Sequence, residues 1–178
     1  AVATLQTNTN ERYLPIGSQI TYSWTVTDRN GGTASSPEQS MIFTDGRFQW
    51  QTKQQGGVTI YWYASAANAD DVLKATADSI AANEALLKVK LGFPVRVVLW
   101  KNAAEGKAAQ RQRAVTFDQN VITGGTRVSP DVLHVYDPLG EGFVDVARHE
   151  AAHIVTKVAG DGKVASMPSW LDEGTAVY

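Results

Sequence analysis

Two of the three histidines in the chain stand four positions apart in the segment "ARHEAAHIVTK", residues 147–157, and a glutamate follows the first. On an α-helix, positions 149 and 153 lie one turn apart on the same face. The imidazoles of His149 and His153 can therefore reach one ion at about 2.0 to 2.1 Å, as in zinc sites. Glu150 projects about 100° further round the helix. This offset suits a general base that takes a proton from an attacking water, so the spacing predicts a metal site with a base beside it.

Two histidines do not complete such a site, because a catalytic zinc usually has three protein ligands and one open position. The downstream candidates for the third ligand are Asp161, Asp172 and Glu173. Asp161 lies in a glycine-flanked turn, where a solvent-facing role is favoured. Glu173 lies 20 positions after His153, on what we expect to be the next helix, and two antiparallel helices would bring it opposite the histidines. Taken alone, the pattern at 149–153 also fits a polar helix face without metal.

The two motifs together resemble a known family. "HEAAH" followed by "PSWLDEGTAVY" looks like the gluzincin zinc metallopeptidases, and it is most similar to bacterial peptidase MA-like domains with a W-L-x-E-G-x-A-x-Y segment. The matching residues are Trp170, Leu171, Glu173, Gly174, Ala176 and Tyr178. The resemblance implies that His149, His153 and Glu173 bind Zn²⁺, that Glu150 is the general base, and that the substrate is a peptide or protein. It also implies that Gly174 lets its helix approach the first helix closely.

The resemblance also marks what this sequence lacks. Gluzincins generally supply a tyrosine or histidine from beyond the third-ligand helix to stabilise the oxyanion, and the sequence given stops at Tyr178. We expect Tyr178 to pack or to hydrogen-bond near the site. Thermolysin-like members orient a ligand histidine with an aspartate one turn after the third ligand, where this chain has Val177. The expectation is a zincin domain truncated at its C-terminus, with a whole metal site and incomplete catalytic apparatus.

The elements that would position these residues begin near residue 66. Helical spacing of apolar residues predicts a helix over 67–92, ended by Gly92. A β-branched strand over 93–101, one or two strands before residue 137, and a helix over 141–160 follow. A last helix begins at Ser169, with Asp172 as a capping-box partner. The predicted fold class is α+β, with the mixed sheet and active-site helix of a zincin-like domain.

The first third of the chain predicts antiparallel β-strands. Residues 18–32 alternate apolar and polar side chains, as in a half-buried strand that ends in an Asn-Gly-Gly turn. Further strands are expected within 37–52 and 56–63. The segment 14–43 resembles the last strands of an immunoglobulin or fibronectin-type sandwich. The predicted domains are a partial sandwich over 1–56 and a peptidase MA-like domain over 57–178.

Other conspicuous residues have weaker functional interpretations. His134 is expected to be a strand residue with ordinary hydrogen bonds, the alternative being a substrate contact. Gly124 and Gly125 indicate either a β-bulge or a close approach of extended peptide to an edge strand. Four tryptophans in strand-like contexts, Trp24, Trp50, Trp62 and Trp100, indicate packing in a core or between domains.

Composition excludes several classes of function. The chain has 178 residues, a net charge of −2 and no cysteine, so we expect neither a nucleic-acid partner nor a thiolate metal site. No apolar run approaches the roughly 18 to 20 residues of a membrane span. The sandwich resemblance implies a secreted or cell-surface protein, and nothing indicates an oligomeric state. The alternative to a peptidase is a non-catalytic extracellular binding module that retains a zincin fold.

Overall fold

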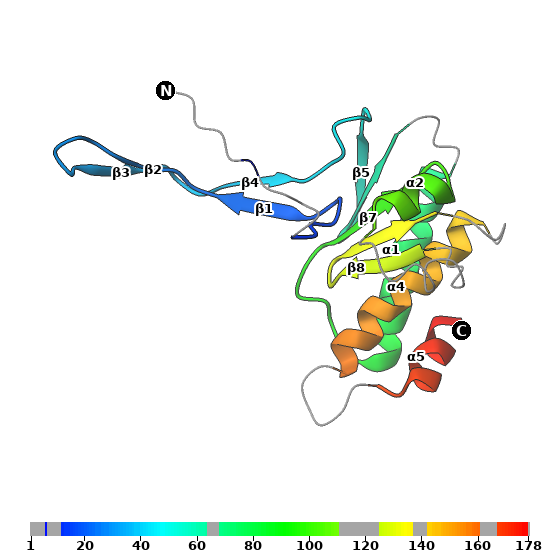
Figure 1. Cartoon of the computed structure of the whole chain (residues 1–178). Coiled ribbons are helices and arrows are strands. Elements are labelled where there is room, and N and C mark those ends of the chain that lie inside the picture. Colours follow the sequence, from blue (N-terminus) through cyan, green and yellow to red (C-terminus); the bar gives the residue numbers. More distant parts are fainter. Residues whose placement is uncertain are drawn as a thin grey trace.

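The main body of the molecule is a mixed sheet with helices packed on one face. The computed structural model describes residue 6 and residues 12–63, 68–110, 125–136, 142–160 and 167–177. Within these residues, Figure 1 shows a sheet backed by α1 and α4, and a separate hairpin arm extending from it. The predicted α+β fold class is confirmed. No helix in the described part of the chain has the length and apolarity needed to cross a membrane.

The sheet has five strands in the order β5-β6-β7-β9-β8. The strands are β5 Gln51–Gln55, β6 Val58–Trp62, β7 Val95–Leu99, β8 Gly125–Ser129 and β9 Val132–Val135. The three inner strands run parallel, and the two edge strands are antiparallel to their neighbours. Every residue of β7 is buried, which explains its almost wholly apolar sequence, because an inner parallel strand is covered on both faces.

The helices are α1 Ala69–Leu87, α2 Ala103–Ala108, α4 Phe143–Gly160 and α5 Ser169–Val177. Helix α4 packs extensively against α1. Its small side chains Ala147 and Ala151 are both fully buried. The core on this face of the sheet combines apolar residues of α1, α4 and the inner strands. The predicted helix over 141–160 is thereby confirmed, with its start at Phe143.

The predicted end of the first helix is wrong. Helix α1 stops at Leu87 instead of Gly92, and Lys88 follows with a positive φ of 53°. Glu84 stabilises this earlier end, because its carboxylate accepts hydrogen bonds from the backbone N–H of Leu91 at 2.7 Å and from Nζ of Lys90 at 2.6 Å. The residues after Leu87 therefore return to the sheet instead of extending the helix.

The hairpin arm differs from the half-buried strands predicted for it. It consists of β1 Gln19–Tyr22, β2 Thr25–Thr27, β3 Thr33–Ser35 and β4 Gln39–Ile42, in which β1 pairs with β4 and β2 with β3. Trp24 is 43% and Val26 66% exposed, so packing is the wrong interpretation for Trp24. Alternation predicted the strands, but no second layer covers the arm among the described residues.

The predicted division at residue 56 falls within one sheet. Residues 56–57 form the turn between β5 and β6, which are paired along their length. The strand β5 therefore belongs structurally with the segment that follows it. The assignment of two domains stays a prediction.

The base of the arm is held on the sheet face opposite α1 and α4. Nε2 of the buried His134 donates a hydrogen bond to the carbonyl of Ile16 at 2.8 Å, and Nη1 of Arg96 donates to the carbonyl of Gly17 at 3.0 Å. Gly17 has a φ of +91°, and a Cβ there would lie 2.8 Å from a methyl group of Val98. Close approach of backbone to sheet therefore needs glycine at this position. The ordinary hydrogen bonding predicted for His134 is confirmed.

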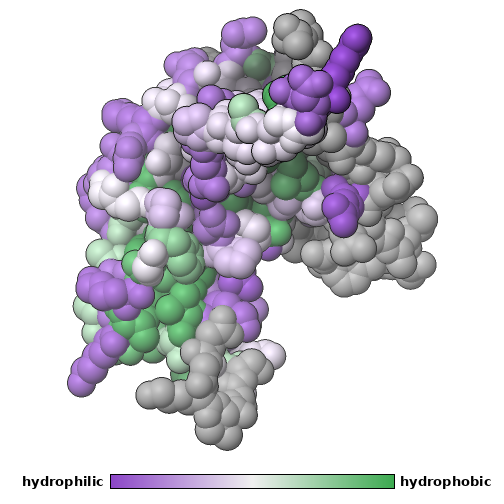
Figure 2. Space-filling model, turned by 90° about the vertical axis from the view of Figure 1, so that its left-hand side faces the viewer, coloured by the Kyte–Doolittle hydropathy of each residue, from purple (hydrophilic) through white to green (hydrophobic). Residues whose placement is uncertain are grey.

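An apolar hollow of about 250 Å³ lies between α1, the β5–β6 turn and the start of β7. Its walls are apolar except for Glu84, whose carboxylate is already engaged in the turn after α1. Figure 2 shows hydrophobic residues gathered on the lower part of the face turned to the viewer. This hollow is separate from the residues predicted to bind metal, none of which lines it.

Candidate metal centre

Helix α4 presents both histidines of the motif toward α5. His149 and His153 are half-buried, whereas Ala151 and Ala152 between them are buried in the core. The rings of the two histidines lie 4.7 Å apart, nearly perpendicular to each other. One face of α4 therefore anchors the helix while the adjoining face carries the two imidazoles, as the four-residue spacing predicts.

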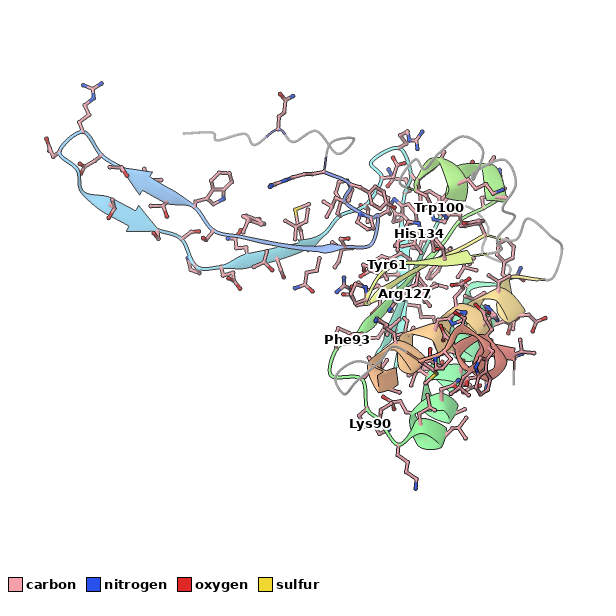
Figure 3. All side chains as sticks on the ribbon, turned by 60° about the horizontal axis from the view of Figure 1, so that its bottom comes forward. Tyr61, Lys90, Phe93, Trp100, Arg127 and His134 are labelled. Carbon is pink, nitrogen blue, oxygen red and sulfur yellow. The ribbon has the colours of Figure 1, made fainter. Side chains whose placement is uncertain are left out.

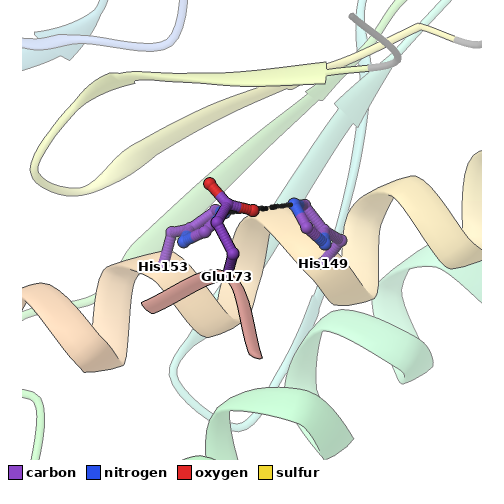
Figure 4. A group of neighbouring side chains, drawn as sticks. All are labelled: His149, His153 and Glu173. Atoms are coloured by element: carbon purple, nitrogen blue, oxygen red, sulfur yellow. Dashed lines mark hydrogen bonds and ion pairs between the residues drawn. The ribbon is translucent and has the colours of Figure 1, made fainter. Parts of the chain in front are cut away.

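The structure brings Glu173 of α5 to the same point. Oε2 of Glu173 lies 3.5 Å from Nε2 of His149 and 3.7 Å from Nε2 of His153, and the two Nε2 atoms are 3.1 Å apart. Figure 4 shows the carboxylate facing both rings across the gap between the helices. Of the three downstream carboxylates, Glu173 is the one grouped with both histidines within the described residues. Asp161 lies outside those residues.

These separations fit a metal ion. A tetrahedral ion with bonds of about 2.0 to 2.1 Å keeps its ligand atoms about 3.3 Å apart, and the three separations are 3.1, 3.5 and 3.7 Å. Two imidazole nitrogens and one carboxylate oxygen are also a donor set that zinc accepts. The side chain of Glu173 is 61% exposed, so a fourth position can open to solvent.

Asp172 orients one of the histidines. Its Oδ1 lies 2.8 Å from Nδ1 of His153 and also accepts a hydrogen bond from Oγ1 of Thr156. An ionised carboxylate only accepts, so Nδ1 carries the proton and Nε2 keeps its lone pair for the metal. Burial raises the pKa of Asp172, but the hydrogen bonds from Thr156 and His153 outweigh it and hold that pKa below its usual value.

Sequence reasoning missed this role of Asp172. The sequence has no aspartate one turn after Glu173, where Val177 is 80% exposed, and Asp172 was expected to cap its own helix. The described hydrogen bonds of the Asp172 carboxylate go instead to α4. An aspartate directly before a predicted carboxylate ligand was the available signal, because neighbouring helix positions diverge by about 100° and can reach different sides of one imidazole.

Glu150 lies on the side of α4 that faces the edge strand β8. Burial raises the pKa of its carboxyl group, while the charge of His153 and, more weakly, the backbone N–H and the guanidinium of Arg127 act in the opposite direction. A raised pKa brings a carboxylate closer to the range in which it exchanges protons with a reacting group. Glu150 therefore lies next to the group formed by His149, His153 and Glu173 but is not a member of it.

Gly125 lets β8 lie against this part of α4. A Cβ at Gly125 would stand 2.8 Å from Val146 Cγ1, 2.9 Å from the carbonyl oxygen of His134 and 3.0 Å from Glu150 Cγ. The close approach seen at Gly125 is to α4 and to the neighbouring strand, and the approach of an extended peptide to β8 stays a prediction. The irregularity in the β8–β9 pairing lies between Arg127 and Ser129, so Gly125 is not a bulge.

The expectations for four further residues have different outcomes. A Cβ at Gly174 would meet nothing within 4 Å, so the close helix approach expected there is wrong: the glycine faces open space. His134 is fully buried and hydrogen-bonds the base of the arm on the opposite sheet face, which contradicts a substrate contact. Tyr178 and Gly124 lie outside the described residues.

Comparisons with known proteins add no family to this picture. The sequence matches no family model, and no curated protein matches it.

Proposed function

We propose that the chain is the zinc-binding part of a gluzincin-type metallopeptidase, with a zincin-like fold, that hydrolyses peptide bonds. The observation that carries the proposal is the set of separations of 3.1, 3.5 and 3.7 Å among the donor atoms of His149, His153 and Glu173. A general base on the same helix supports it. Zinc held there would lower the pKa of a water toward about 7 and polarise a carbonyl group.

The residues of the chain would divide the remaining work. Asp172 accepts a hydrogen bond from Nδ1 of His153. This keeps the proton on Nδ1 and leaves Nε2 unprotonated, which is the tautomer that a ligand through Nε2 requires. Glu150 would take a proton from the attacking water and deliver it to the leaving amine. This carboxyl group is half-buried between α4 and β8, which limits the competition of bulk water for that proton.

The edge strand offers a place for the substrate backbone. Strand β8 pairs with β9 on one side, and no other described strand pairs with its second side. An extended peptide can add to such an edge through main-chain hydrogen bonds. We propose that the substrate lies along β8, so that one of its carbonyls reaches the metal centre beside Glu150.

The test uses the zinc-loaded full-length protein, including any residues that follow Tyr178, and a mixture of unstructured peptides. We expect hydrolysis that a chelator abolishes and added zinc restores. Glu150→Gln should retain zinc and lower kcat by about 10² to 10⁴, the usual contribution of a general base. Glu38→Gln, which removes the same charge from the exposed arm, is the matched control and should leave kcat unchanged.

Two results contradict this assignment. Wild-type turnover by Glu150→Gln would show that another group is the base. A protein that binds zinc but cleaves no peptide would favour the non-catalytic binding module.

Native protein found only in the cytosol would contradict the proposed secreted or cell-surface location.

A further inference from the structure

Arg127 is a cation on the edge strand, on the same side of the sheet as α4. It pairs with Leu133 of β9, and Gly125 pairs with Val135. Leu133 and Val135 belong to the core under the helices, and Gly125 contacts α4 directly. Since alternate strand residues share a face, Arg127 must project toward α4. Figure 3 shows it between the edge strand and the helices.

The charge of Arg127 reaches two carboxylates of the metal centre. It acts on Glu150, the proposed base, and on Asp172, which orients His153. Together with its place on the side of β8 that faces α4, this puts the guanidinium on the side of the site that carries Glu150. Arg127 is only partly buried, so a ligand can approach it from solvent.

Among the described residues, Arg127 differs from Arg96, the buried arginine of the sheet, in having no ion-pair partner. Arg96 is held by Asp131 at 2.7 Å, whereas no aspartate or glutamate in the described part of the chain forms a salt bridge with Arg127. A guanidinium carries five donors in a planar fork that matches a carboxylate. Donors that face a site and remain unused are available to a ligand.

We propose that Arg127 binds a carboxylate of the substrate, so that the site prefers peptides with a negative charge close to the bond that is cleaved. This inference depends on the proposed function, because it assigns a substrate class to that metal centre. An acidic side chain and the carboxylate at a peptide's C-terminus have the chemistry that Arg127 would recognise. Either would form the same two-pronged, charge-assisted hydrogen bonds.

The test compares matched peptides that differ in one charge. One series carries Glu or Gln at successive positions around a cleavable bond, with an amidated C-terminus. A second series carries Gln throughout and ends in either a free carboxylate or an amide. The first series detects recognition of a side chain, and the second detects recognition of the chain end. We expect kcat/KM to favour the charged member of one series by about ten- to a hundredfold.

Arg127→Gln should abolish that preference, so that the charged and neutral members of each pair have the same kcat/KM, and Arg127→Lys should retain part of it. Arg148→Gln is the matched control, because Arg148 is an exposed residue of α4 paired with Asp145. It should keep the full preference. Circular dichroism and zinc content of each variant separate loss of recognition from loss of fold.

A second measurement does not depend on turnover. Calorimetry of the same peptides with zinc-loaded Glu150→Gln should give the charged member a Kd lower by a similar factor, and Arg127→Gln in that background should equalise the pair. Equal rates and equal Kd values for charged and neutral peptides in the wild type would overturn the role of Arg127 but not the peptidase. Absence of zinc binding would overturn both. Equal slowing of charged and neutral peptides by Arg127→Gln would show that Arg127 only balances the charge of the carboxylates.

Discussion

The pair formed by His153 and Asp172 decides which nitrogen of the imidazole is available for metal. The carboxylate is 2.8 Å from Nδ1, so the proton stays there and Nε2 points at Glu173. A metal ligand loses affinity when such an orienting partner is removed, typically by 10- to 100-fold. We therefore expect Asp172, which also accepts a hydrogen bond from Thr156, to raise the affinity of the site for zinc without touching the ion.

Asp172→Asn is expected to weaken zinc binding by about 10- to 100-fold, because a neutral amide neither attracts the Nδ1 proton as strongly nor fixes one tautomer. Competition against a chromophoric chelator measures the affinity. Asp145→Asn, on the exposed side of α4, is the control and should bind zinc as the wild type does. Equal affinity in both variants would show that Asp172 is not an orienting residue.

Residue types and spacing predicted that His149, His153 and Glu173 would lie together, as they do, but they did not predict the neighbours of this group. The i and i+4 histidines need only the helix geometry, and Glu173 came from the resemblance to a second motif. Asp172 was missed because its role depends on how α5 is rotated against α4. That rotation is set by packing between the two helices, which one helical sequence does not contain.

At the scale of elements, the spacing between β8 and α4 places Glu150. The absence of a side chain at Gly125 permits that spacing, since its Cβ would stand 2.8 Å from Cγ1 of Val146 and 3.0 Å from Cγ of Glu150 on α4. The same Cβ would stand 2.9 Å from the carbonyl oxygen of His134 on β9. A backbone atom cannot turn aside as a flexible side chain can. The strand or the helix would have to move.

Gly125→Ala is therefore expected to lower the free energy of unfolding by about 1 to 3 kcal/mol and to reduce hydrolysis more than zinc affinity, because Glu150 shifts while the histidines stay. Denaturant titration and zinc competition measure the two effects. Unchanged stability would mean that the strand has room for a methyl group and does not fix Glu150.

Gly174→Ala gives the opposite expectation on the neighbouring helix. Its Cβ would meet nothing, and alanine favours a helix over glycine by roughly 0.5 to 1 kcal/mol. The variant should be slightly more stable with unchanged zinc affinity. A loss of zinc affinity would show that Gly174 does lie close to the first helix, as the resemblance implied.

The elements themselves were predicted to different degrees for physical reasons. Apolar periodicity identified α1, α4 and the buried β7, because burial imposes it on the sequence. The end of α1 was misplaced because Glu84 reaches forward to residues 90 and 91, a contact that periodicity does not record. The arm was predicted as strands, yet alternation alone could not tell that no second layer covers it.

At the scale of the whole molecule, one buried histidine joins the arm to the sheet. His134 is fully buried, and burial lowers its pKa from 6.5 to about 4 although the carbonyl of Ile16 acts in the opposite direction. The folded protein therefore keeps His134 neutral at pH values where the unfolded chain already binds a proton.

This difference predicts how stability depends on pH. Above about 6.5 neither state protonates His134, and as the pH falls from 6.5 to about 4 the unfolded chain gains a proton that the folded protein does not. The free energy of unfolding therefore falls by up to about 1.4 kcal/mol for each pH unit over this range, and by roughly 3 kcal/mol in total. His134→Gln does not titrate, so the difference in unfolding free energy between variant and wild type should shrink over this range. A constant difference would contradict the burial of a neutral His134.

Binding of one zinc ion by His149, His153 and Glu173 is measured by titrating the protein with zinc. We predict one zinc per chain in the wild type and a large loss of affinity in His149→Ala, His153→Ala and Glu173→Ala, while Glu150→Gln still binds one ion. A wild-type protein that binds no zinc, or a Glu173→Ala variant that binds it as tightly as the wild type, would show that these three residues do not form a zinc site.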